Sequence, residues 1–278
     1  MKRVLLLTGC MIFLYSCGNH IEKQAGEKLK LAQEAFGRED FDEALRQLDS
    51  IKIQYPRAFE TRKAGNELEM QVKLKDLGQR IAAMDLQLRE KEQTLGEIRG
   101  KYTLEKDEEY QRTGNYLWPT QVLEKNLHRC YLRFQVNEQG AMSMTSVYCG
   151  KGNINHHSIK VSAPDDTFAQ TPPARNSYQT TDLDEKIEKA DFKLGEDGGV
   201  MEFIYAHPDQ NIRIEYIGDR SFRTQMLPTD REALVGIYEL YQLLASMETL
   251  KKEKQEAELE VQFINERIRR KTEESATD

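Results

Sequence analysis

Apolar residues recur at alternating steps of four and three along two long and otherwise polar stretches of the chain. The first stretch runs from Met70 to Tyr102 and the second from Leu240 to Lys271. Each is a heptad seam of about four heptads, the pattern of a coiled-coil helix. Lys91 and Lys254 interrupt the seams, and a lysine can lay its methylene groups along an apolar seam while its ammonium reaches water. The two seams comprise Met70, Leu74, Leu77, Ile81, Met84, Leu88, Leu95, Ile98 and Tyr102, and Leu240, Leu243, Met247, Leu250, Ala257, Val261, Ile264 and Ile268.

The matched lengths of the two seams predict that they pair with each other in antiparallel orientation. Tyr102 would then face Leu240, and Met70 would face Lys271. Pairing between two copies of the chain, or flat packing in a bundle, would satisfy the same pattern and is the alternative. In the antiparallel arrangement the segment between the seams would sit at the tip of a stalk roughly 50 Å long, at about 1.5 Å per residue.

The segment between the seams alternates apolar and polar residues in short runs, which is typical of β-strands. Residues 130–137 and 141–149 both alternate, and Glu138-Gln139-Gly140 between them is a turn signal. Pairing of the two runs across that turn is expected to place Cys130 opposite Cys149, and Tyr131 opposite Tyr148 on the other face. The sequence therefore predicts a disulfide, or a buried thiol pair, between Cys130 and Cys149.

A second hairpin is predicted from residues 201–205 and 212–216, which would pair across the turn at 207–210. Further strands are expected at 158–162, 190–194 and 221–227, whereas 164–181, rich in Pro, Thr, Asn and Gln, is typical of a long exposed loop. Seven short strands with one solvated face favour a β-sandwich.

The N-terminus has the pattern of a secretory signal. Lys2 and Arg3 precede an apolar run over residues 4–15 that is too short to span a bilayer. The sequence Leu14-Tyr15-Ser16-Cys17 resembles the bacterial lipobox, which implies that Cys17 is diacylated and becomes the first mature residue. An ordinary signal peptide with an incidental cysteine is the alternative. Gly18 at the second mature position, in place of an aspartate retention signal, implies an outer-membrane location by the same resemblance, facing either the periplasm or the cell surface.

Residues 21–37 and 41–55 predict a helical hairpin that ends at Pro56. The hairpin resembles a single tetratricopeptide repeat in Ala32, Ala35, Phe36, Asp40 to Leu45, Leu48, Ile51 and Tyr55-Pro56. Arrays of such repeats need about three or more copies to bury a continuous core, and this chain has one. We therefore expect a small base packed on the start of the first stalk helix.

These elements together predict an α+β protein in which an antiparallel coiled coil formed by two distant helices has a β-sandwich inserted at its tip. The predicted organisation is a signal segment at 1–17, the hairpin at 18–57, the first stalk helix at 58–112, the β-head at 113–228, the second stalk helix at 229–273 and a tail at 274–278.

Composition narrows the classes of function. The chain has 278 residues, a formal net charge of -7, and 31% charged residues that are interleaved rather than blocked. No basic patch with interleaved aromatic residues is present, which argues against binding to nucleic acid. If Cys17 is acylated and Cys10 is removed with the signal, Cys130 and Cys149 are an even pair in an oxidising compartment.

No motif for catalysis, nucleotide binding or metal binding is present, so we expect neither an enzyme nor a cofactor. His156 and His157 are adjacent on a predicted strand and would point to opposite faces. His128 near Cys130 lacks a third group to orient it, and the acidic residues 182–185 lack the spacing of a calcium loop. The remaining candidate site is an aromatic platform of Trp118, Tyr131 and Tyr148, which could stack on a sugar ring.

The whole chain resembles the uncharacterised cell-envelope lipoproteins of the Bacteroidetes, with segments 131–133, 158–165 and 212–216 contributing to that resemblance. It implies a location and an architecture but no activity. The leading hypothesis is a non-enzymatic lipoprotein whose lipid on Cys17 holds it to a membrane and whose β-head meets a protein partner of the envelope. The alternative is a glycan-binding lipoprotein that uses the aromatic platform.

Overall fold

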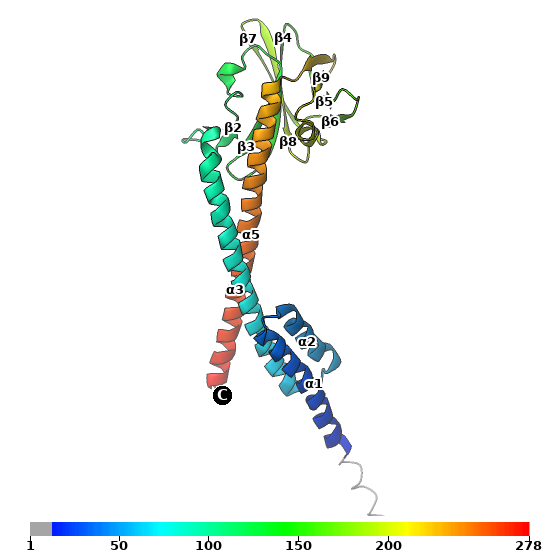
Figure 1. Cartoon of the computed structure of the whole chain (residues 1–278), viewed down its shortest axis with the longest axis vertical. Coiled ribbons are helices and arrows are strands. Elements are labelled where there is room, and N and C mark those ends of the chain that lie inside the picture. The colour runs from blue at the N-terminus through cyan, green and yellow to red at the C-terminus, as the bar shows by residue number, and fades with distance from the viewer. Residues whose placement is uncertain (1–12, 278) are drawn as a thin grey trace, which may run out of the picture. The chain divides into compact units, whose positions relative to one another are not determined.

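The computed structural model describes the backbone of residues 13–277 and the side chains of residues 20–274. Most of the predicted signal segment, and the side chain of the predicted lipidation site Cys17, therefore lie outside the described residues. The described chain forms five α-helices and two antiparallel β-sheets (Figure 1). The prediction of a mixed α+β protein is confirmed at this level.

The chain divides into two compact units. Residues 1–86 and 252–278 form the first, which we call the helical unit, and Gln87–Lys251 forms the second, the sheet unit. The two longest helices, α3 (Phe59–Ile98) and α5 (Pro228–Thr277), each contribute one part to either unit.

In the helical unit, α1 (Phe13–Gly37) and α2 (Phe41–Gln54) form the predicted hairpin and pack on the first turns of α3. Asp40 caps α2 by accepting a hydrogen bond from the backbone N–H of Glu43 at 3.1 Å. The shared core is built mainly from small and aliphatic side chains of all three helices: Ala25, Ala32, Ala35, Ala44, Leu48, Ile51, Ala58, Leu68 and Val72. The alanines allow close approach of the three helices.

A long-range hydrogen bond ties α1 to the beginning of α3. The Glu22 carboxylate accepts the Thr61 hydroxyl at 2.6 Å and the backbone N–H groups of Glu60 and Thr61 at 3.3 Å each. The Thr61 hydroxyl is the largest cause of a lowered pKa at Glu22. Because the first N–H groups of a helix have no partner within it, this carboxylate caps α3 from a different helix.

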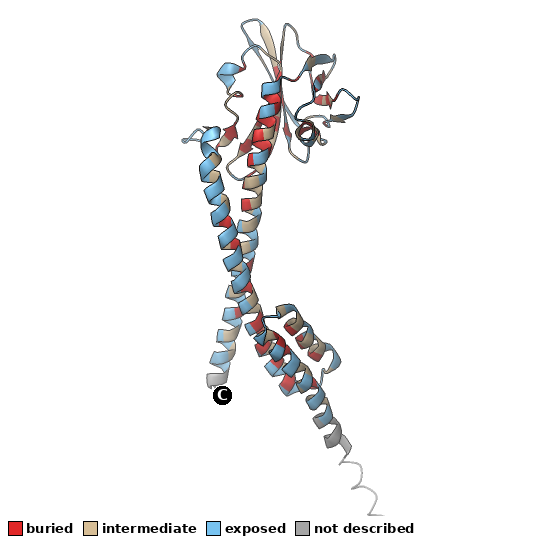
Figure 2. Cartoon of the chain, in the orientation of Figure 1, coloured by how far each residue is buried: buried red, intermediate tan, exposed pale blue. Residues whose placement is uncertain are grey.

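Apolar seam residues are buried in the parts of α3 and α5 that belong to the helical unit. Met70, Leu77 and Met84 of α3 and Ala257 and Ile264 of α5 are buried, and Figure 2 shows buried positions recurring at intervals along both helices. Lys254, which interrupts the second seam, reaches out of it to Asp85 of α3 at 2.6 Å. This ion pair lies close to the antiparallel register that the two seams predict.

The helix α3 ends earlier than predicted. The first stalk helix is predicted over residues 58–112, but α3 ends at Ile98, and the 3₁₀-helix η1 (Arg99–Lys101) and strand β1 (Thr103–Glu105) follow. The main chain of β1 pairs with β2 (Asn115–Leu117), and the Tyr102 hydroxyl donates to the carbonyl of Gly236, one helical turn before Leu240. Pairing partners distant in sequence therefore end the helix, although the local pattern continues.

The sheet unit contains both β-sheets. The larger sheet has the strand order β1-β2-β3-β4-β8-β7 and the smaller has β10-β9-β5-β6. The remaining strands and the short helices of this unit are η2 (Leu123–Lys125), β3 (Tyr131–Asn137), β4 (Met142–Gly150), β5 (Ser158–Ser162), β6 (Phe168–Gln170), β7 (Asn176–Asp182), β8 (Glu185–Lys193), α4 (Val200–Ala206), β9 (Arg213–Ile217) and β10 (Phe222–Gln225).

One core fills the space beneath the larger sheet. Leu132, Phe134 and Met144 from that sheet, Ile159 and Ile214 from the smaller sheet, and side chains of α4 and the beginning of α5 are buried in the same cluster. The turn between β3 and β4 lies against α5, since a Cβ added to Gly140 would lie 2.6 Å from the backbone nitrogen of Ala245. Gly140 also has a φ of 77°, a conformation that favours glycine.

The predicted strand at residues 201–205 is wrong, because this segment is the helix α4. Its backbone begins after two glycines of positive φ, and the buried Asp197 carboxylate accepts the N–H of Met201 at 2.7 Å. Val200, Met201 and Ile204 are buried together, which is helical spacing. The strand at 158–162 is confirmed, and the predicted loop at 164–181 instead contains β6 and most of β7.

The first hairpin forms as predicted, but its register differs by one residue. Tyr131 pairs with Val147, and Val136 with Met142, which is the register symmetric about the three-residue loop at 138–140, closed by a hydrogen bond from Asn137 N to Ala141 O at 3.0 Å. A loop with an even number of residues would be needed to place Cys130 opposite Cys149. A shift of one residue exchanges the faces of a strand. Tyr131 and Tyr148 consequently lie on opposite faces, and so do Cys130 and Cys149.

Candidate functional site

A small cleft lies on the face of the larger sheet that points away from the core. Strands β3, β4 and β8 form its floor, and the segment between β2 and β3 forms one wall. The cavity volume is about 60 Å³, which is room for a few water molecules or one small side chain. The residues that line it are Leu123, Asn126, Leu127, His128, Arg129, Tyr131, Val147, Cys149, Asp182, Ile187 and Lys189.

Polar side chains hold the wall segment in place. The buried Asn126 amide donates to the carbonyls of Thr120 and Val122 at 2.8 and 2.7 Å. The Arg129 guanidinium donates to Asn126 Oδ1 at 2.8 Å and to the carboxylate of Asp230, in the first turn of α5, at 2.5 Å. Local hydrogen bonds and one ion pair to α5 therefore fix the wall of the cleft.

The same segment leaves two leucines in solvent. Leu123 and Leu127 are 49% and 54% exposed, on either side of the buried Asn126. Beneath them, Val147 is buried and Ile187 is half-buried. Arg129 lies over the ring of Tyr131 at 4.7 Å, so that ring is covered from solvent. Apolar side chains that are exposed beside an apolar cleft are typical of a contact surface.

A carboxylate at the rim of the cleft is shared by a histidine and a thiol. Glu185 Oε2 lies 2.5 Å from His128 Nδ1 and 3.2 Å from Cys149 Sγ. The hydrogen bond to Glu185 raises the pKa of His128, and the pKa of Glu185 is lowered in return. Burial, followed by the hydrogen bond to Glu185, raises the pKa of Cys149 to about 12. A thiol with so high a pKa is protonated at neutral pH and is a poor nucleophile.

The two cysteines do not form the predicted disulfide in the structure, where both are free thiols. Cys130 faces the core, with its Sγ 3.2 Å from both the backbone nitrogen and the carbonyl oxygen of Cys149, and burial raises its pKa. Cys149 lies on the opposite face, in the cleft. The one-residue difference in register separates the two thiols.

The predicted aromatic platform does not form. Tyr131 is 2% exposed and Tyr148 is 6% exposed, and they face opposite sides of the sheet. Trp118 lies against Gly236 of α5 and meets the ring of Tyr102 edge-on, with centroids 5.7 Å apart. The three side chains therefore share no exposed surface on which a sugar ring could stack.

Sequence reasoning missed a polar triad in the core. His156 Nδ1 lies 3.0 Å from Glu188 Oε2, and His156 Nε2 lies 2.8 Å from the Ser146 hydroxyl. Glu188 also accepts the backbone N–H groups of Ile154, Asn155 and His156 at 2.8, 3.0 and 2.8 Å. No local pattern relates Glu188 to a segment more than thirty residues earlier.

The triad resembles a nucleophile, base and orienting acid in its spacing, but all three side chains are buried. Burial lowers the pKa of His156, so the ring is neutral, donates from Nδ1 and accepts from the serine. Burial alone would raise the pKa of Glu188, yet the N–H groups that it accepts bring the pKa below its usual value. The hydrogen bonds that Glu188 accepts hold the segment before β5 in place, which is a structural role.

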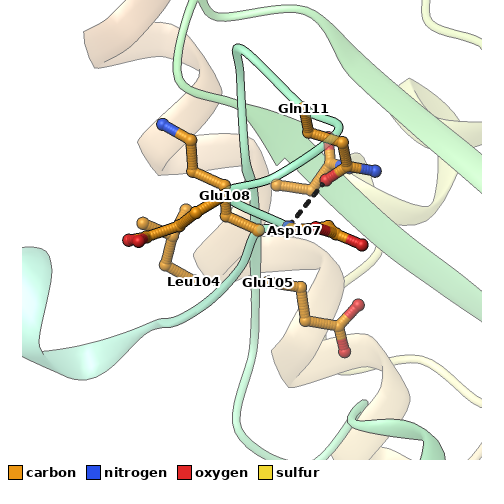
Figure 3. A pocket seen from close by; sticks show the side chains of 7 residues that line it. Leu104, Glu105, Asp107, Glu108 and Gln111 are labelled. Carbon is orange, nitrogen blue, oxygen red and sulfur yellow. Dashed lines mark hydrogen bonds between the residues drawn. The ribbon is translucent and has the colours of Figure 1, made fainter.

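A larger and more open pocket follows β1, where the loop at residues 104–111 folds back on itself (Figure 3). Its cavity volume is about 720 Å³, and the backbone N–H of Asp107 donates to the Gln111 side chain at 3.2 Å. Among its carboxylates, Glu105 is already paired with Arg133 at 2.5 Å. We assign this pocket no binding role.

Within the part of the chain that the structure describes, no group of three or more metal-ligating side chains could hold an ion. No helix among the described residues is long and apolar enough to cross a membrane. No protein family, curated protein or solved structure matches the chain.

Proposed function

We propose that this chain is a non-enzymatic lipoprotein of the bacterial cell envelope that acts as an adaptor. Lipid on Cys17 would anchor it, the helices α3 and α5 would act as a spacer, and the sheet unit would bind a protein partner through the cleft that Leu123 and Leu127 border. The observation that carries this proposal is the apolar cleft with its two exposed leucines. Hydrogen bonds of Asn126 and Arg129 hold the segment that carries these leucines in place.

Several observations support the spacer. We propose that α3 and α5 pair as an antiparallel coiled coil, because their seam residues are buried and Lys254 meets Asp85. We also propose that the two sheets are packed as a β-sandwich around the core that they share. The anchor is supported by the sequence around Cys17 and by its resemblance to a lipobox, with the outer membrane as the proposed location.

The absence of catalysis is part of the proposal, and the chemistry of the polar clusters supports it. The serine, histidine and glutamate of the core triad are sealed from solvent. The thiol in the cleft has a pKa raised to about 12 by burial and by Glu185. Neither arrangement offers an accessible nucleophile beside a base, which nucleophilic catalysis would need.

Site-specific photo-cross-linking in the native envelope tests the adaptor. A photoreactive residue replaces Leu127 in the cleft wall and, as control, the exposed Arg89 of α3 in the same unit. We expect a defined protein to be captured from position 127 alone, and its capture to be lost in Leu123→Glu but kept in Leu227→Glu, an exposed leucine outside the cleft. Capture of polysaccharide, or equal capture from both positions, would contradict the proposal.

The anchor has its own test. Palmitate should label the native protein and should not label Cys17→Ala. The variant, without its lipid, should leave the membrane fraction. Labelling that persists in Cys17→Ala would place the lipid elsewhere and remove this part of the proposal.

A further inference from the structure

The connection between α2 and α3 exposes two large apolar side chains to solvent. Ile53, in the last turn of α2, is 78% exposed, and Phe59, the first residue of α3, is 71% exposed. The helical unit has its own core, and neither residue belongs to it.

Hydrogen bonds place this connection beside the N-terminal part of α1. Glu22 accepts the N–H groups of Glu60 and Thr61 and the Thr61 hydroxyl. Cys17 precedes Glu22 by five residues in the same helix α1, about 7.5 Å along the helix axis at 1.5 Å per residue. Phe59 therefore lies within one or two helical turns of the residue that the proposed function acylates.

The charges around the two apolar side chains are predominantly positive. Lys23, Arg57 and Lys63 are exposed, and no ion pair involves any of them among the described residues. Glu60 is an exposed carboxylate at this end, while Glu22 is occupied as the cap of α3. Basic side chains beside a membrane are attracted to anionic lipid headgroups.

We infer that this end of the helical unit is a second membrane contact, with Ile53 and Phe59 inserted at the headgroup boundary and Arg57 and Lys63 on anionic headgroups. The inference rests on the proposed lipid anchor at Cys17. The headgroup region of each leaflet is about 5–7 Å thick, which is comparable to the rise of about 7.5 Å along α1 from Cys17 to Glu22, the residue that bonds the start of α3. A second contact would fix the orientation of the unit on the bilayer, which flexible acyl chains alone do not.

Quenching by brominated lipids tests the contact in the full lipidated protein. Phe59→Trp is compared with Leu86→Trp, because Leu86 is 61% exposed and lies roughly 40 Å farther along the same helix α3. The emission of Trp118, the single native tryptophan, is subtracted by using the parent protein. The vesicles are phosphatidylethanolamine with or without phosphatidylglycerol.

We expect brominated lipids to quench the tryptophan at position 59 at least about twofold and to leave that at position 86 unchanged. The quenching should weaken in Arg57→Glu with Lys63→Glu and in vesicles without phosphatidylglycerol. Equal quenching at both positions would overturn the inference. If the protein carries acyl chains and sediments with vesicles but position 59 is not quenched, the inference alone fails, whereas a protein without acyl chains overturns the proposed anchor as well.

Discussion

Replacement of Glu188 by glutamine should destabilise the sheet unit strongly, although the two side chains have nearly the same shape. In the native protein one carboxylate oxygen accepts the N–H groups of Ile154 and Asn155, and the other accepts the N–H and the ring Nδ1 of His156. Glutamine retains one acceptor oxygen and presents an amide NH₂ at the other position. Two of the four donors then face a donor, in a site where the side chain is 2% exposed.

The magnitude follows from the hydrogen bonds that are lost. A buried donor left without an acceptor costs about 1–3 kcal/mol, so the two donors left facing the amide NH₂ together cost about 2–6 kcal/mol. We therefore expect the free energy of unfolding to fall by about 3–5 kcal/mol in Glu188→Gln. With a urea m-value of about 2 kcal/mol/M, the midpoint would fall by roughly 1.5–2.5 M.

Urea unfolding followed by the fluorescence of Trp118 measures this change, because Trp118 is a residue of the sheet unit. Glu185→Gln is the matched control, since Glu185 also bonds a histidine but lies at the exposed rim of the cleft, and we expect little change there. A loss below about 1 kcal/mol in Glu188→Gln, or equal losses in both variants, would show that the buried triad does not support the fold.

Three further predictions concern titration, packing and reactivity. Burial lowers the pKa of His156 below 6.5, so the unfolded chain binds more protons on acidification than the folded chain. The free energy of unfolding should therefore fall as the pH falls below about 6.5, by at most about 1.4 kcal/mol per pH unit. His156→Gln should flatten this slope in urea titrations from pH 7 to 5, and an unchanged slope would contradict the assignment. Gly236→Ala should destabilise the sheet unit by about 1–3 kcal/mol, since a Cβ there meets the indole of Trp118. Gly96→Ala, where a Cβ meets open space, should stabilise α3 by up to about 1 kcal/mol in thermal unfolding. Equal losses of stability in the two variants would refute the packing argument. Alkylation of Cys149 by iodoacetamide at pH 8 should be slow in the folded protein and faster in Glu185→Gln, because burial and the Glu185 carboxylate together raise the thiol pKa and the variant removes the carboxylate. Mass spectrometry of tryptic peptides measures the two rates, and equal rates would show that the carboxylate has no influence.

Local periodicity was enough to predict the hairpin of α1 and α2, the two long helices and several strands. The hairpin of α1 and α2 and the long helices follow from apolar residues on one helical face, which must be buried wherever the helix lies. The strand at 158–162 likewise alternates within five residues. These elements depend on neighbours within one or two turns, so the sequence alone contains the information.

Residues 201–205 show where local periodicity fails. Their alternation of Met201, Phe203 and Tyr205 fits a strand, but the structure buries Val200, Met201 and Ile204 on one face of α4. The Asp197 carboxylate and two glycines of positive φ begin that helix. Short apolar runs fit both patterns, and the neighbours that pack against them decide between the two.

The sequence by itself determined the mixed helix and sheet architecture, the two apolar seams and the N-terminal hairpin, because each follows from local spacing. Only the tertiary structure decided which side chains meet. The register of the first hairpin is set locally, because its three-residue loop leaves Cys130 and Cys149, like Tyr131 and Tyr148, on opposite faces. The cleft below Leu127, in contrast, depends on Arg129 reaching Asp230, a residue 101 positions later. Such long-range contacts are set by how loops and helices close on one another, and no local pattern contains them.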